Sequence, residues 1–142
     1  MGELLKKEGY SNLTASDISH EMLKKAQEKN LYQDFFQADL TEKINKPNES
    51  FESIVSIGVS GYMKNHSINE LVRILKVDGF LIYTISDDHF KNAEFDQVVE
   101  ELKKENSIKV LEKTDTFLPL PKSHSTHLAR VHIYQKIKKW MR

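Results

Sequence analysis

The spacing of apolar positions in the first third of the chain switches between that of a helix and that of a strand. Residues 2–9 have helical spacing and end in a glycine, residues 13–16 form a short apolar-leaning run, and residues 20–30 return to helical spacing. Ser19 stands where an N-terminal helix cap is needed. Residues 31–40 then predict a second strand. The pattern therefore predicts the order helix, strand, helix, strand.

The middle of the chain repeats this alternation with more strongly apolar segments. Apolar residues lie close together in residues 51–63, which is typical of a strand covered on both faces, and we expect this strand to be the most buried. An amphipathic helix is predicted over residues 67–76. Residues 77–79 predict a tight turn that relies on Gly79, and residues 80–85 predict the next strand.

The last third of the chain predicts a helix over residues 93–106 and then two strands, 107–120 and 127–137, joined by a polar loop. These two strands follow one another directly, which predicts a C-terminal antiparallel pair. Because strands and helices alternate before that pair, we predict an α/β fold. It would be a Rossmann-like, doubly wound, mostly parallel sheet with helices on both faces. We expect a single domain over residues 1–142.

Composition and charge limit the partners of the chain. Its 142 residues include 21 Lys plus Arg and 21 Asp plus Glu, so no net charge attracts nucleic acid or an anionic membrane. The sequence has no Cys, which excludes disulfides, thiolate metal ligands and a Cys nucleophile. No apolar run approaches the roughly 20 residues that span a bilayer. We expect a cytoplasmic protein that binds no metal, no nucleic acid and no membrane.

Two acids follow predicted parallel strands, at the end where such sheets bind ligands. Asp17 and Asp39 come after the first two strands, and open α/β sheets bind ligands at the carboxyl ends of their strands. A carboxylate has two acceptor oxygens, so Asp17 can bind two ribose hydroxyls while Asp39 accepts from an adenine amino group. The apolar neighbours Ile18 and Leu40 can hold the adenine ring between them. One interpretation is an adenosine pocket; the other takes Asp17 as a turn residue near a helix N-terminus.

Four stretches in this order carry a family resemblance: ASDISHEMLKKAQ, FQADL, FESIVSIG and INELVRILKVDGFLIYTI. Together they resemble successive motifs of class I S-adenosylmethionine-dependent methyltransferases, over nearly the whole chain. Within that family the likeness is greatest to the group around the methyltransferase-like protein of the Williams–Beuren syndrome region. That likeness rests on EKNLYQ and on the spacing between SIGVSGYM and INEL. The resemblance implies a methyltransferase fold, S-adenosylmethionine as cofactor, and methyl transfer to a small-molecule acceptor.

The resemblance also assigns residues to the cofactor. It implies six binding residues: for the ribose Asp17, for the adenine Ile18, Asp39 and Leu40, and for the floor near the methionine part Ile57 and Gly58. No catalytic residue is assigned, because methyl transfer depends largely on positioning and needs no named general base. The stretch LKVDG departs from the Lys-Pro-Gly-Gly turn of the family but keeps its last glycine, Gly79.

The glycine-rich loop of the family has no counterpart in the sequence. The family begins with a strand and a GxGxG loop, and this chain contains no such motif. We therefore expect an N-terminally truncated copy that lacks a strand between those ending at Asp17 and near Ile57. We expect these two strands to pair directly, because each unpaired buried backbone group costs about 1–3 kcal/mol. S-adenosylmethionine binding should be weak or undetectable, so a micromolar affinity by calorimetry would contradict this expectation. Whether such a copy is active stays open.

Two other classes of function stay open. In the first, the chain is a non-catalytic remnant of the family that acts as an interaction module, pairing through an exposed sheet edge with a partner or as a homodimer. In the second, it is an unrelated doubly wound domain of the response-regulator type, which Asp17 and Asp39 fit less well than they fit adenosine. The Asn/Asp-Pro-Pro-aromatic signature of nucleic-acid amino-group methylases is absent, which argues against a DNA substrate.

Overall fold

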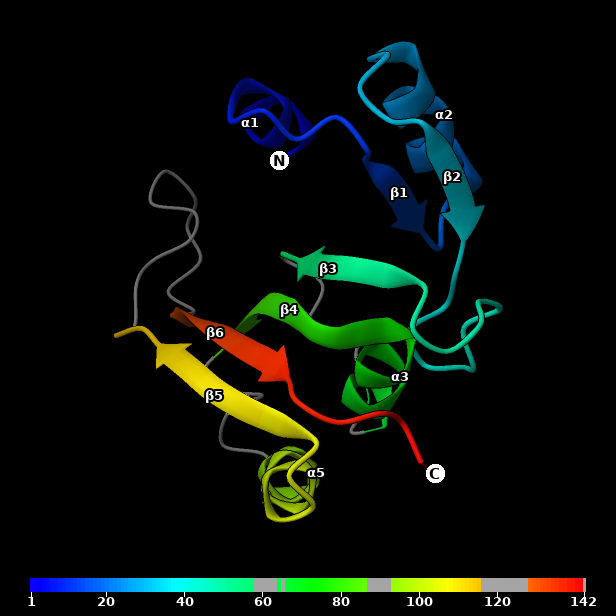
Figure 1. Ribbon diagram of the computed structural model, residues 1–142. Coiled ribbons are helices and arrows are strands. Elements are labelled where there is room, and N and C mark those ends of the chain that lie inside the picture. The colour runs from blue at the N-terminus through cyan, green and yellow to red at the C-terminus, as the bar shows by residue number, and fades with distance from the viewer. Residues whose placement is uncertain (58–63, 65, 87–92, 116–127, 142) are drawn as a thin grey trace. The chain divides into compact units, whose positions relative to one another are not determined.

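The computed structural model describes residues 1–57, 64, 66–86, 93–115 and 128–141 (Figure 1). Contacts between residues divide the chain into two compact units, Met1–Asn45 and Lys46–Arg142, which we call the first and the second unit. The order of helices and strands in the described residues is the order that the sequence predicts. Whether the two units act as one domain stays a prediction.

The first unit is a parallel two-stranded sheet with helices before and between the strands. Its elements are α1 (Gly2–Lys7), β1 (Thr14–Asp17), α2 (His20–Glu28) and β2 (Asp34–Gln37). The strands run in register from Thr14 opposite Asp34 to Asp17 opposite Gln37. Ser19 caps α2 as predicted, because its side chain accepts a hydrogen bond from the Met22 N–H at 3.3 Å. The parallel register therefore brings the carboxyl ends of β1 and β2 side by side.

Two glycines explain how the first unit begins. Gly9 has a φ of +96°, so the chain leaves α1 through a left-handed position that glycine adopts without strain. Gly2 is buried, and a Cβ at that position would collide with the ring and hydroxyl of Tyr32. The start of α1 therefore packs against the chain between α2 and β2.

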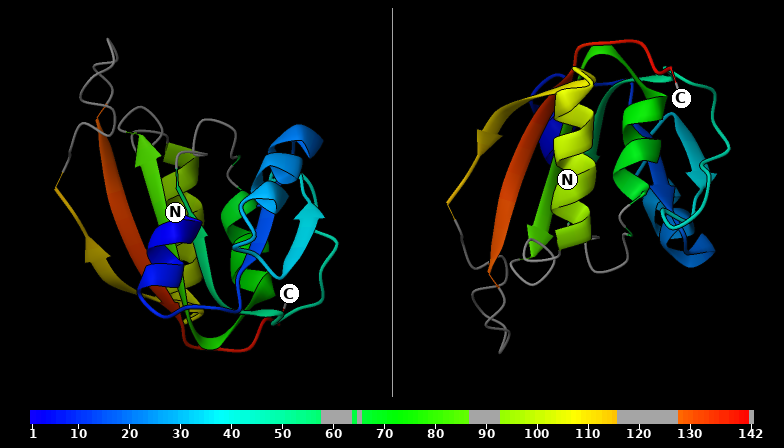
Figure 2. Two further views of the ribbon diagram at one scale, coloured as in Figure 1. Left: turned by 90° about the horizontal axis from the view of Figure 1, so that it is seen from above. Right: turned by 90° about the horizontal axis from the view of Figure 1, so that it is seen from below.

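The second unit is a four-stranded mixed sheet with two helices on one face. Its elements are β3 (Phe51–Ser56), α3 (Ser67–Ile74), β4 (Leu75–Ser86), α5 (Ala93–Lys104), β5 (Ile108–Lys113) and β6 (Ala129–Lys136). The strand order is β3-β4-β6-β5, in which β3 and β4 are parallel and the other two pairs antiparallel. The predicted C-terminal antiparallel pair is thus confirmed. Both views in Figure 2 show α3 and α5 on the same face of this sheet.

The core of the second unit lies between the sheet and these two helices. Alternate residues of β4, namely Leu81, Tyr83 and Ile85, point into it and are at most 2% exposed. The apolar stripe of α3 and residues of α5 and β6 complete the core: Ile68, Leu71, Val72, Val99, Leu102 and Tyr134. The helical and alternating spacings that predicted these elements are therefore the spacings of the buried positions.

The predicted turn at residues 77–79 is wrong, because these residues lie inside the continuous strand β4. The left-handed residue there is Asp78, with a φ of +66°, and the register against β3 shifts at this point. Gly79 is needed for another reason. A Cβ on Gly79 would lie 2.5 Å from the Glu52 carbonyl oxygen and 2.8 Å from that of Lys76. The glycine therefore permits the backbone of β4 to approach Glu52 of β3 closely and to bend back toward its own Lys76 carbonyl.

The sequence predicted that β3 would be the most buried strand, and this prediction is wrong. Strand β3 is an edge strand of its sheet. It has β4 as its neighbour on one side only among the described strands, and Val55 and Ile57 are 37% and 43% exposed. The expected direct pairing of β1 with β3 is also wrong. In the described residues the two belong to separate sheets, and each has a single neighbour.

No helix in the described part of the chain is long and apolar enough to cross a membrane.

Candidate cofactor site

Asp17 lies at the carboxyl end of β1 with its backbone and side chain both held in place. The Ser19 N–H donates to Oδ1 of Asp17 at 2.9 Å, and the Ala38 N–H donates to the Asp17 carbonyl oxygen at 3.2 Å. The first bond closes a turn between the strand and the N-terminus of α2, a site that favours negative charge. Asp17 is half-buried, and the bond from Ser19 holds its carboxylate in place.

Asp39 follows β2 and is held in the same way. The Thr41 N–H donates to Oδ1 of Asp39 at 2.8 Å, and the Thr41 hydroxyl donates to the same oxygen at 2.6 Å. Because β1 and β2 are parallel and adjacent, this turn and the Asp17 turn lie at the same end of the sheet. The prediction that both acids follow strand ends is confirmed.

The two turns share a sequence pattern that the sequence analysis missed. Asp17-Ile18-Ser19 and Asp39-Leu40-Thr41 both read Asp, apolar, hydroxyl, and in both the carboxylate accepts the N–H two residues later. Asp and Asn commonly close turns in this way, so the repeated triplet was the available signal. The pattern places an apolar side chain between two polar ones at each strand end.

The apolar residues of these turns differ in exposure. Ile18 is 59% exposed, while Leu40 is half-buried. The carbonyl oxygen of Ile18 accepts a hydrogen bond from Nε2 of Gln37 at 2.7 Å, a contact that the sequence analysis also missed. Gln37 is the last residue of β2, so its side chain ties one strand to the turn that follows the other.

The side chains at this end of the first unit's sheet fit the adenosine half of a nucleoside cofactor. Two carboxylates at one sheet end supply acceptors for hydroxyl and amino groups, and an exposed Ile supplies an apolar surface for a flat ring. These features come from Asp17, Ile18 and Asp39. What the site could do by itself is bind and orient such a group.

The remaining predicted site residues belong to the second unit. Ile57 comes directly after β3 and is 43% exposed. Gly58 lies outside the described residues. The role of both in lining the methionine part of the cofactor stays a prediction.

A buried polar cluster joins β4 to β6 in the second unit. The Tyr83 hydroxyl donates to that of Tyr134 at 3.0 Å, and Nδ1 of His132 lies 3.0 Å from the Tyr134 hydroxyl. Burial, with the nearby charges of Lys113 and Arg130, lowers the pKa of His132 to about 4. Burial also raises the pKa of Tyr134 to about 12. The cluster therefore stays uncharged at neutral pH and contributes to the core.

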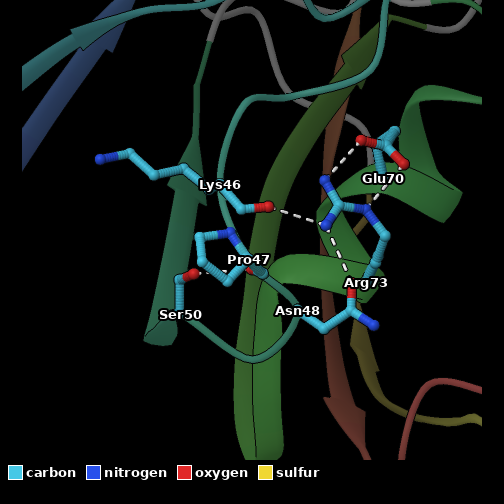
Figure 3. A network of polar contacts seen from close by, with 6 residues as sticks. All are labelled: Lys46, Pro47, Asn48, Ser50, Glu70 and Arg73. Atoms are coloured by element: carbon cyan, nitrogen blue, oxygen red, sulfur yellow. Dashed lines mark hydrogen bonds and ion pairs between the residues drawn. The ribbon is translucent and has the colours of Figure 1, made fainter.

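A second polar network fixes the segment that leads into β3 (Figure 3). The Arg73 guanidinium donates to both carboxylate oxygens of Glu70 at 2.9 and 2.8 Å, and to the Lys46 carbonyl and the Asn48 side chain at 2.8 and 3.0 Å. Its bonds to Glu70 raise the pKa of Arg73. The described residues contain no group of three or more His, Cys, Asp or Glu that could hold a metal ion.

A family model described as a methyltransferase domain matches residues 2–83, which is more than half of the chain. The chain belongs to the methyltransferase domain family. The matched range of this methyltransferase domain contains both Asp turns and extends into β4. A search of curated proteins found no match.

Solved structures share the fold of the methyltransferase domain at low sequence identity. The TehB-like SAM-dependent methyltransferase of Corynebacterium glutamicum is 18% identical, with a TM-score of 0.69 over 95% of this chain and 73% of that one. The complex of the Haloferax volcanii Trm112 methyltransferase activator with a methyltransferase matches at 14% identity, with a TM-score of 0.70 over 99% of this chain and 78% of that one. The [4+2]-cyclase SpnF is 14% identical, with a TM-score of 0.67 over 95% of this chain and 70% of that one. Because a cyclase shares this fold, the fold alone does not fix the reaction.

Proposed function

We propose that this methyltransferase domain transfers a methyl group from S-adenosylmethionine to a small-molecule acceptor. The observation that carries the proposal is the pair of Asp turns at one end of the β1–β2 sheet. Membership of the methyltransferase domain family supports the reaction class. The balance of acidic and basic residues favours a small acceptor over nucleic acid.

In this proposal the residues of the first unit bind and orient the cofactor, which supplies the methyl group. Asp17 accepts from the ribose hydroxyls, Ile18 packs against the adenine, and Asp39 accepts from its amino group beside Leu40. Ile57 and Gly58 line the methionine part. The contribution of these residues to the rate is positioning, which accounts for much of the catalysis when two reacting groups are held together.

Transfer of a labelled methyl group tests both the reaction and the acceptor class. The chain is incubated with S-adenosylmethionine that carries tritium in its methyl group, together with the small-molecule, nucleic-acid or protein fraction of a cell extract. We expect label to appear in the small-molecule fraction and to decrease with Asp17→Asn. Label confined to nucleic acid or protein would contradict the acceptor, and the absence of transfer in all three fractions would contradict the activity.

Two finer assignments belong to the same proposal. The stretch EKNLYQ and the spacing before INEL support a place near the methyltransferase-like protein of the Williams–Beuren syndrome region. The lack of an apolar spanning run in the sequence supports a cytoplasmic location.

A second candidate function is an interaction module that pairs through the edge of β3 with a second copy of the chain. The two edges of the second unit's sheet differ in protection. Edge strand β5 carries Lys109, Lys113 and a register shift after Val110, which are common devices against pairing. Edge strand β3 also has a register shift, between Phe51 and Ser53, but it carries only one charged residue, Glu52, and it exposes the apolar Val55. A two-fold axis would pair β3 antiparallel with its copy, which is a self-complementary contact.

Light scattering on matched edge variants tests this candidate. We expect the wild-type chain to form a dimer that Val55→Lys converts to a monomer, because a charge on the pairing edge opposes strand addition. Leu111→Lys on β5 is the control, since Leu111 is also exposed, at 44%, and should leave the dimer intact. A wild-type monomer, or a dimer that Leu111→Lys dissociates, would exclude pairing through β3.

A further inference from the structure

The turn after β1 is held by contacts from β2 as well as by its own residues. The Ala38 N–H donates to the Asp17 carbonyl at 3.2 Å, and Nε2 of Gln37 donates to the Ile18 carbonyl at 2.7 Å. Asp17 stands directly opposite Gln37 in the register. The end of β2 therefore fixes two consecutive carbonyl groups of the neighbouring turn, one through its backbone and one through a side chain.

The side chain on this fixed turn is an exposed apolar one. Ile18 is 59% exposed, so few neighbouring side chains restrain it. Packing normally sets the position of an apolar side chain. For Ile18, the hydrogen bonds to the turn instead hold the backbone that carries the side chain. In the turn after β2, the Thr41 N–H and hydroxyl donate to the Asp39 carboxylate and the Glu42 N–H donates to the Asp39 carbonyl oxygen.

We propose that Gln37 is a positioning residue for the adenine-binding surface of Ile18. This inference rests on the proposed function, because it assigns to Gln37 the task of holding Ile18 in place before the cofactor binds. A surface that is ordered in advance loses less conformational freedom when a ligand binds, which increases affinity. Gln37 acts through the Ile18 backbone and does not itself touch the ligand.

Replacement of Gln37 by Met tests the role of its amide. Met has nearly the same length and cannot donate the hydrogen bond to the Ile18 carbonyl. In the full chain we expect the dissociation constant for S-adenosylhomocysteine, measured by NMR titration, to rise about three- to tenfold. In the ligand-free chain the backbone order parameter of Ile18 should fall below the rigid value of about 0.85. Gln33→Met, an exposed position just before β2, is the matched control and should change neither quantity.

A double-mutant cycle separates positioning from a general structural effect. Ile18→Ala removes the adenine-facing surface and should weaken binding about tenfold. If Gln37 acts through Ile18, then Gln37→Met should add almost nothing in the Ile18→Ala background. Independent, multiplied losses would overturn the inference, as would unchanged binding by Gln37→Met at an unchanged thermal midpoint. A wild-type chain that does not bind the ligand would instead overturn the proposed function, and the inference with it.

Discussion

Replacing Arg73 with Ala should lower the free energy of unfolding of the chain by about 3–5 kcal/mol. The Arg73 side chain is 9% exposed and forms a bidentate ion pair with Glu70. The Glu70 side chain is itself only 16% exposed. The same guanidinium binds the Lys46 carbonyl and Asn48, so it joins α3 to the segment before β3. Removal of one partner from a buried, hydrogen-bonded pair leaves charged and polar groups without compensation. Urea unfolding followed by circular dichroism measures the change.

The control for this prediction is an ion pair with the same spacing and the opposite exposure. Lys103 and Glu100 are also three residues apart on a helix, at 2.6 Å, but their side chains are 40% and 54% exposed. Solvent screens such a pair, so Lys103→Ala should produce no clear change in stability. Arg73→Lys should recover only part of the loss, because an ammonium group cannot make the bidentate contact. Equal small losses for Arg73→Ala and Lys103→Ala would contradict the importance of burial.

The second large effect is a loss of about 3 kcal/mol of stability between pH 7 and pH 4, caused by His132. Burial lowers the pKa of His132 to about 4 in the folded chain, while an unfolded His has a pKa of about 6.5. As the pH falls below 6.5, the unfolded chain binds the proton first and becomes more favourable. The loss is complete once the pH passes below the folded pKa, where both states are protonated.

Comparison of two His variants isolates this contribution from that of the carboxylates. His132→Asn keeps a polar atom near Nδ1, which contacts the Tyr134 hydroxyl, but removes the titrating ring. Its stability should therefore fall less steeply than that of the wild type between pH 7 and pH 4. His20→Asn changes an exposed His on α2 and should keep the wild-type slope. Parallel curves for wild type and His132→Asn would show that His132 does not cause the loss.

The sequence predicted the order of elements because that order follows from local spacing. The helical stripe of α3 and the alternation along β4 both become buried positions. Burial of β3 could not be predicted in the same way, since it depends on which strands lie beside it. An apolar strand that fits the centre of a sheet is here at an edge. The left-handed Asp78 and the close approach at Gly79 likewise depend on the register between β3 and β4.

In the candidate site, too, some features follow from the local sequence and others depend on how the strands pair. That Asp17 and Asp39 follow strand ends was readable from the sequence, because each acid comes at the end of a segment that predicts a strand. The contact from Gln37 to Ile18 was not, because it requires Asp17 to stand opposite Gln37 in the register. The hydrogen bond from the Thr41 hydroxyl to the Asp39 carboxylate was partly predictable, because the short Asp-x-Thr pattern is typical of such a turn.

The central claim is that the two Asp turns of the first unit form an adenosine site. The most direct test is an NMR titration of the full, nitrogen-15-labelled chain with S-adenosylhomocysteine, repeated for Asp17→Asn. Asp34→Asn is the control, an exposed acid at the opposite end of β2. We expect weak, saturable shift changes at residues 17–19 and 39–41, a loss of affinity of at least about tenfold for Asp17→Asn, and no loss for Asp34→Asn. Saturable changes confined to other residues, no saturable change at all, or equal affinities for the two variants would contradict the claim.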